Sequence, residues 1–93
     1  MLLLQAIAEY VKDNHSKWNI ESLYDDMIVV RHLTKTLKHV TLIHILIYKG
    51  TINARYPQAG VLYDKTFKYN SANILQITEE IITTAEQLPI MNI

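Results

Sequence analysis

The chain has 93 residues, of which 49% are hydrophobic and 19% are charged, and its formal net charge at pH 7 is zero. This composition favours one ordered domain spanning residues 1–93 and argues against a disordered tail. The chain has no cysteine, which excludes disulfides and thiolate metal sites. It shows neither a signal peptide nor a run of about 18 apolar residues, so we expect a cytoplasmic protein.

The charges are unevenly distributed along the chain. Residues 1–30 carry five acidic and two basic side chains, residues 31–70 carry seven basic and one acidic, and residues 71–93 carry three acidic ones. A basic middle segment can mark a partner surface, but lysines also protect the edges of a sheet from pairing with other chains. Both interpretations of the basic middle segment stay open.

The N-terminal third of the chain predicts a helix followed by a strand. Apolar side chains recur every three or four residues over 2–13, the spacing of an amphipathic helix. Residues 17–22 are too few for a helix and alternate Trp18 and Ile20 with polar neighbours, which predicts a short strand.

The segment 22–38 gives conflicting signals. Ser22 with Asp25 three residues later is typical of a helix-capping box, whereas residues 27–30 favour a strand. We predict a helix here, with a strand as the alternative.

Residues 39–48 predict a central strand, because apolar side chains occupy both of its faces. Lys49 and Gly50 suit a two-residue hairpin turn, in which Gly50 supplies a positive φ. Residues 51–56 should then return antiparallel to the central strand.

The last third predicts a turn, a strand and a helix. Pro57 opens the turn, residues 61–69 alternate as a strand with one face in the core, and residues 71–88 form a helix that ends before Pro89. The predicted fold class is α+β, an antiparallel sheet of three to five strands with an N-terminal helix, a second helix and a C-terminal helix.

The four histidines do not form a metal-binding pattern. His39 and His44 fall on opposite faces of their predicted strand because their spacing is odd, and His15 and His32 lie elsewhere. The sequence also lacks a nucleophile elbow and a glycine-rich phosphate loop. We therefore expect no metal, no cofactor and no enzymatic activity.

Basic residues interleaved with aromatic ones, at Lys49, Arg55, Lys65 and Lys68, make a nucleic-acid-binding sheet one alternative. A helix, three strands and a helix in this order are similar to double-stranded RNA-binding domains. The glycine- and lysine-rich start of their last helix is absent from residues 71–76, however.

Residues 17–26 read Lys-Trp-Asn-Ile-Glu-Ser-Leu-Tyr-Asp-Asp. This segment resembles the Glu-Ser-Ile/Leu element of the uracil-DNA glycosylase inhibitors encoded by phages and mobile elements. The order of features is also similar: an N-terminal helix, a Lys-Trp pair, Glu-Ser two residues beyond it and then an acidic pair. A strand hairpin like that at 44–48 and an aromatic strand end like that at 67–69 follow, so the resemblance spans most of the chain.

Proteins of that family imitate DNA, because carboxylates and a hydroxyl replace backbone phosphates in the enzyme's groove while an apolar pocket takes the side chain that the enzyme would wedge into the duplex. The resemblance implies that uracil-DNA glycosylase is the partner. It also implies which residues bind that partner. Glu21 and Ser22 would be the central contacts, Leu23 would form part of the pocket rim, and Asp25 and Asp26 would be secondary phosphate mimics. The neighbouring Met27 completes this set of partner-binding residues.

Two other interpretations of the acidic segment need no glycosylase. Ser22 can cap a helix whose N-terminus Glu21, Asp25 and Asp26 favour electrostatically, which requires no partner. Alternatively, the chain is a phage or mobile-element interaction module with another target, and forms a homodimer through its apolar central strand.

Overall fold

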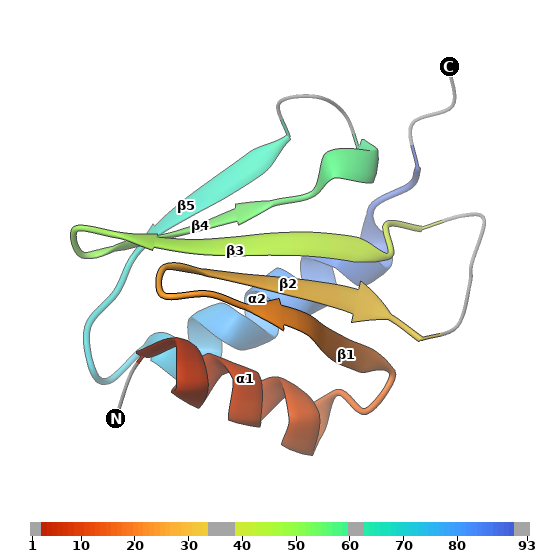
Figure 1. Ribbon diagram of the computed structural model, residues 1–93. Coiled ribbons are helices and arrows are strands. Elements are labelled where there is room, and N and C mark those ends of the chain that lie inside the picture. Colours follow the sequence, from red (N-terminus) through yellow and green to blue (C-terminus); the bar gives the residue numbers. More distant parts are fainter. Residues whose placement is uncertain (1–2, 34–38, 60–62, 91–93) are drawn as a thin grey trace.

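A computed structural model describes residues 3–33, 39–59 and 63–90. In this part of the chain the elements are, in order, α1 (Leu3–Asn14), β1 (Trp18–Leu23), β2 (Met27–His32), β3 (Leu42–Tyr48), β4 (Thr51–Arg55), a short 3-10 helix (Pro57–Ala59), β5 (Asp64–Lys68) and α2 (Ile74–Gln87). The five strands form one antiparallel sheet in the order β1-β2-β3-β4-β5, so each strand pairs with the next one along the chain (Figure 1). Neither helix is long and apolar enough to cross a membrane.

The α+β class, the antiparallel sheet and the N- and C-terminal helices are confirmed, but the predicted helix within residues 22–38 is wrong. The strand β2 (Met27–His32) lies there, paired on both sides with β1 and β3. The β-branched run that begins at Ile28 therefore outweighs the capping signal at Ser22. Residues 34–38, which the prediction also covered, lie outside the described part of the chain.

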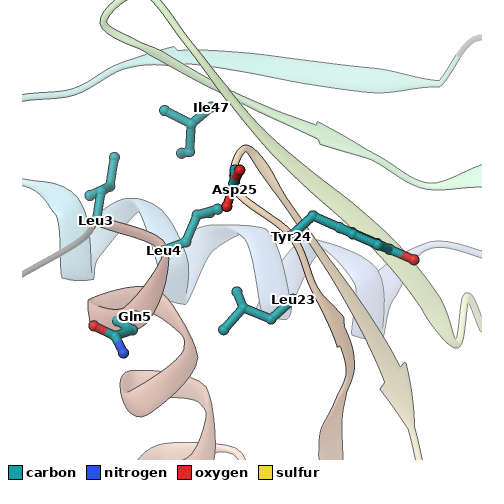
Figure 2. Close-up of a pocket in the computed structure, with 7 residues that line it drawn as sticks. All are labelled: Leu3, Leu4, Gln5, Leu23, Tyr24, Asp25 and Ile47. Atoms are coloured by element: carbon teal, nitrogen blue, oxygen red, sulfur yellow. The ribbon is translucent and has the colours of Figure 1, made fainter.

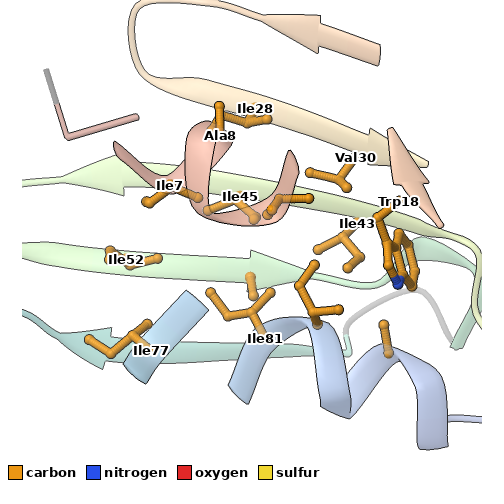
Figure 3. Packing of buried hydrophobic residues seen from close by; sticks show 14 of the residues in the cluster. Ile7, Ala8, Trp18, Ile28, Val30, Ile43, Ile45, Ile52, Ile77 and Ile81 are labelled. Carbon is orange, nitrogen blue, oxygen red and sulfur yellow. The ribbon is translucent and has the colours of Figure 1, made fainter. Parts of the chain in front are cut away.

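Both helices pack on the same face of the sheet, which we call the inner face. In Figure 1 α2 crosses behind β2 and β3, and in Figure 3 side chains from both helices meet those of the strands. Ile28, Ile45 and Ala54 form one row across this face, and all three are fully buried. One hydrophobic cluster thus joins α1, α2 and the sheet.

No helix or strand of the described residues covers the opposite face of the sheet, which we call the outer face. Met27 and Val29 of β2 pair there with Leu46 and His44 of β3. All four side chains, three apolar ones and a histidine, are half-buried, in contrast to the fully buried inner row. As predicted, β3 is the central strand of the sheet. Both of its faces carry apolar side chains, but only the inner face enters the core.

The turn between β3 and β4 has the predicted length of two residues. Tyr48 pairs with Thr51, and the two residues between them have positive φ angles, 41° at Lys49 and 81° at Gly50. Two consecutive positive φ angles are the signature of a type I′ hairpin turn, whose twist matches that of the strands.

Replacing Gly50 with alanine should lower the free energy of unfolding by about 1 kcal/mol, because an L side chain is strained at this φ. A Cβ atom at Gly50 would contact nothing within 4 Å, so backbone strain is the only cost. Urea unfolding of the variant measures this, and Lys49→Asn is the control, expected to be neutral because asparagine tolerates a positive φ. Equal losses in the two variants would contradict the turn assignment.

A polar contact outside the core joins the two helices. The hydroxyl of Tyr10 donates to Glu79 Oε1 at 2.8 Å, and His15 Nε2 lies 2.7 Å from the same oxygen. These two hydrogen bonds hold the pKa of Glu79 below its ordinary value of 4.5, and the bond from Tyr10 has the larger effect. The same bond raises the pKa of Tyr10.

The contribution of Glu79 to stability should therefore disappear in acid. Because the pKa of Glu79 is lower in the folded protein than in the unfolded chain, its contribution is complete above the unfolded pKa and is lost as the pH falls through the folded pKa. The difference in Tm between the protein and Glu79→Gln, measured across pH, should shrink as the pH falls below 4.5 and through the lowered pKa of Glu79. The exposed Glu86, changed to glutamine, is the control and should shift Tm little at any pH. A Glu79→Gln difference that persists in acid would contradict the assignment.

Candidate functional site

All six residues predicted to bind a partner lie on the hairpin formed by β1 and β2. Glu21, Ser22 and Leu23 end β1, Asp25 and Asp26 lie in the turn, and Met27 begins β2. A single local element therefore places them together, at one edge of the sheet (Figure 1).

A β-bulge sets the position of Glu21. Ile20 pairs with Val30, whereas Ser22 pairs with Val29, so Glu21 is an extra residue on β1 with no partner of its own in the register. Its Oε2 accepts a hydrogen bond of 2.9 Å from Arg31 Nε on β2. Both side chains of this ion pair are partly exposed, so its contribution to stability is small.

The turn of the hairpin is held by its backbone. Tyr24 N donates to Met27 O at 2.8 Å, and Ile47 N of β3 donates to Asp26 O at 2.9 Å. The side chains of Asp25 and Asp26 are exposed, and within the described residues they make neither an ion pair nor a side-chain hydrogen bond. Two carboxylates are thus presented to solvent on a backbone that is anchored to the sheet.

The capping interpretation of Ser22 is wrong. Ser22 is half-buried within β1 and pairs with Val29, and no helix begins at or after it in the described part of the segment. The acidic residues around it therefore do not stabilise a helix N-terminus. Asp25 and Asp26 instead occupy the exposed turn between β1 and β2.

An apolar hollow of about 530 Å³ adjoins this turn. Figure 2 shows how the start of α1 faces the hairpin across it, with Asp25 at the hairpin tip and Ile47 on β3. Most of its lining is apolar or aromatic, and it consists of Leu3, Leu4, Gln5, Leu23, Tyr24, Asp25 and Ile47. Leu23 is 49% exposed although it is a large apolar residue, so part of the hollow is open to solvent.

Sequence reasoning found Leu23 and Asp25 but missed the other lining residues of this hollow. Leu3, Leu4 and Ile47 come from two other elements and meet the hairpin only because α1 packs beside β1. The apolar start of the chain was the available signal, but it was interpreted only as the core face of a helix. Met27, in contrast, lies on the outer face, opposite Leu46, and does not line the hollow.

The histidines are dispersed in the structure. His15 contacts Glu79, His32 stacks edge-on against Trp18, His39 bridges to Pro89 and His44 lies on the outer face. Among the described residues, no group of three or more histidine, aspartate or glutamate side chains is placed to hold a metal ion.

The four basic residues weighed for nucleic-acid binding do not share one face of the sheet. Lys65 lies in the inner row and its Nζ contacts Glu80 of α2 at 3.0 Å. Arg55 and Lys68 are on the outer face, while Lys49 lies in a turn above the ring of Tyr48. This placement gives no continuous basic stripe in the described residues.

The described residues define a small α+β protein in which no helix or strand covers one sheet face and an acidic hairpin lies beside an apolar hollow. Comparison of the chain with protein-family models, with curated proteins and with solved structures gives no match. Functional inference therefore rests on residues 17–26 and on the geometry of the hairpin that carries them.

Proposed function

We propose that this protein is a non-enzymatic inhibitor that binds uracil-DNA glycosylase and occupies its DNA-binding cleft. The observation that carries the proposal is the exposure of Asp25 and Asp26, without side-chain partners in the described residues, at the edge of an apolar hollow. This arrangement supports the role that the sequence resemblance implies for the same segment.

The chemistry of the hairpin suits a surface that normally grips DNA. Proteins bind DNA phosphates with arginine, lysine, hydroxyl and backbone N–H donors, and carboxylates accept hydrogen bonds from all of these groups. Asp25 and Asp26 need not break an existing ion pair to accept them. Leu23 and the hollow beside it would receive an apolar side chain of the enzyme, burying surface that is now exposed.

Glu21 takes a secondary part in this arrangement, because Arg31 already donates to its carboxylate. To accept a hydrogen bond from the enzyme, Glu21 must either share its oxygens or release Arg31. A carboxylate can accept several hydrogen bonds, so sharing costs less than release. Ser22 is half-buried and, paired with Val29, lies on the outer face of the sheet.

The zero formal net charge shapes the expected kinetics. Long-range attraction to a positively charged cleft is weak for a neutral protein, so association should be less sensitive to salt than for a strongly acidic DNA mimic. A cytoplasmic location belongs to the proposal, since the inhibitor must meet an enzyme that acts on cellular DNA.

Release of uracil from a uracil-containing duplex tests the proposal directly. Adding this protein to uracil-DNA glycosylase should abolish uracil release at a molar ratio near one to one. Raising the concentration of uracil-containing DNA should restore it if the two compete for the cleft. Undiminished excision in a molar excess of the protein would contradict the proposal, and the hairpin would then serve another target.

A further inference from the structure

We propose that the free edge of β5 (Asp64–Lys68) pairs antiparallel with β5 of a second copy of this chain, so that the two sheets join into one continuous sheet. A two-fold axis at Thr66 relates the two copies. This inference goes beyond the proposed function and does not depend on it.

The two edge strands of the sheet, β1 and β5, differ in how well they could accept another strand. The bulge at Glu21 interrupts β1, and α1 packs beside this strand, so pairing there is hindered. In contrast, β5 pairs with β4 along its whole length without a bulge. No helix or strand of the described residues lies beyond β5, which forms the margin of the sheet in Figure 1.

The backbone of β5 directs alternate residues to the open edge. Tyr69 N, just after the strand, donates to Gly50 O at 3.2 Å, so the odd-numbered residues direct their N–H and C=O groups towards β4. The even-numbered residues Asp64, Thr66 and Lys68 therefore direct theirs away from the sheet. All three are exposed.

Most of these outward backbone groups have no partner. Within the described residues a hydrogen bond reaches Lys68 O, which accepts from Asn73 Nδ2 at 3.3 Å, and none reaches the outward groups of Asp64 or Thr66. A carbonyl oxygen can accept two hydrogen bonds, so Asn73 does not prevent pairing at Lys68. Unpaired N–H and C=O groups in a row are a template for another strand.

A register centred on Thr66 pairs every outward residue of one copy with an outward residue of the other. Thr66 then lies opposite its own copy, and Asp64 lies opposite Lys68 in both directions. Residues directly opposite on antiparallel strands are close enough to interact, so two Asp-Lys pairs flank a Thr-Thr pair on the same face. A register shifted by two residues loses both charge pairs, and one centred on Lys65 places two lysines opposite each other.

The lysines of β5 make this edge selective for its own copy. Lysine on an edge strand normally opposes pairing with other chains. In the register centred on Thr66, however, Lys68 meets a carboxylate, and Lys65 is already paired with Glu80 Oε2 at 3.0 Å. Lys65 Nζ also lies 5.6 Å from the ring centroid of Phe67, and the register places the same two residue types opposite each other across the interface.

The interface is short, so the dimer should be weak, with a Kd on the order of 100 μM. The zero formal net charge removes overall repulsion between two copies. The hairpin of β1 and β2 lies at the opposite edge of the sheet and stays exposed in both copies. The dimer therefore leaves the proposed inhibitor surface accessible.

Sedimentation equilibrium of the purified chain, without any glycosylase, tests the dimer at concentrations of about 10–500 μM. Thr66→Pro removes the outward N–H at the two-fold axis but no hydrogen bond to β4, and it should raise the Kd at least about 10-fold. Thr66→Ala is the matched control. It loses the same hydroxyl, which accepts from Asn53 Nδ2 at 2.9 Å, but keeps the N–H, so the Kd should stay within about threefold. Tm verifies that both variants fold.

The register has its own test in two charge variants. Asp64→Lys places like charges opposite each other in the dimer, and so does Lys68→Asp, so each variant alone should be mostly monomeric. An equimolar mixture of the two variants should form a heterodimer, because each Asp-Lys pair is then restored across the interface.

A chain that stays monomeric at about 500 μM would overturn the proposal and leave the β5 edge to a strand of another protein. A dimer that Thr66→Pro leaves intact would also overturn it. A dimer that Thr66→Pro disrupts, but whose two charge variants do not associate with each other, would overturn the register centred on Thr66. None of these outcomes depends on whether the chain inhibits the glycosylase.

Discussion

Replacement of Ile45 by alanine is expected to lower the free energy of unfolding by about 3–4 kcal/mol, because it removes methylene groups from a fully packed site. Ile45 is completely buried on the inner face, between Ile28 of β2 and Ala54 of β4. A domain of this size has only about 5–15 kcal/mol of stability, so Tm should fall by about 15–20 °C. Thermal and urea unfolding measure the loss.

The adjacent residue on the same strand provides the matched control. Leu46 lies on the outer face and is only half-buried, so Leu46→Ala should cost about 1 kcal/mol in the monomer. The measurement must be made at a concentration at which the chain is monomeric, because a dimer would add to the apparent stability. Similar losses at the two positions would contradict the assignment of inner and outer faces.

Replacement of both Asp25 and Asp26 by asparagine should weaken inhibition of uracil-DNA glycosylase by about 100-fold, because two charge-assisted hydrogen bonds become neutral ones. Both side chains are exposed and make no ion pair with the described residues, so folding should not suffer. The inhibition constant in the uracil-release assay measures the effect, and Tm verifies that the variant remains folded.

The control variant for this prediction changes charge elsewhere by the same amount. Asp13→Asn with Glu86→Gln removes two exposed carboxylates, one at the end of α1 and one near the end of α2, both away from the hairpin. It should leave inhibition within about twofold of the unmodified protein, because general electrostatic attraction contributes little. Equal losses in the two double variants would show that net charge, not the hairpin, determines inhibition.

Much of the fold follows from the sequence because its patterns are strong and local. The periodicity of α1 and α2 gives their positions to within a few residues, and the Lys49-Gly50 turn gives the β3–β4 register. The error at β2 has a physical cause. A capping signal depends on a few side chains, whereas pairing of Ile28 and Val30 with two neighbouring strands is long-range and invisible in a short window.

The candidate site was predictable only in part, for the same reason. The acidic residues of the hairpin are adjacent in the chain, so the sequence could place them together. The hollow beside them joins residues far apart in the chain, from α1, from the hairpin and, with Ile47, from β3. The bulge at Glu21 was also unforeseen, because no glycine or proline marks it.

The claim that the acidic hairpin occupies the DNA-binding cleft of uracil-DNA glycosylase is tested most directly by competition for the enzyme. A labelled duplex bound to the glycosylase should be displaced by an equimolar amount of this protein, followed by fluorescence anisotropy, and the Asp25→Asn, Asp26→Asn variant should displace it far less. A glycosylase that holds the duplex and this protein at the same time, or that keeps its duplex in a molar excess of the protein, would contradict the account.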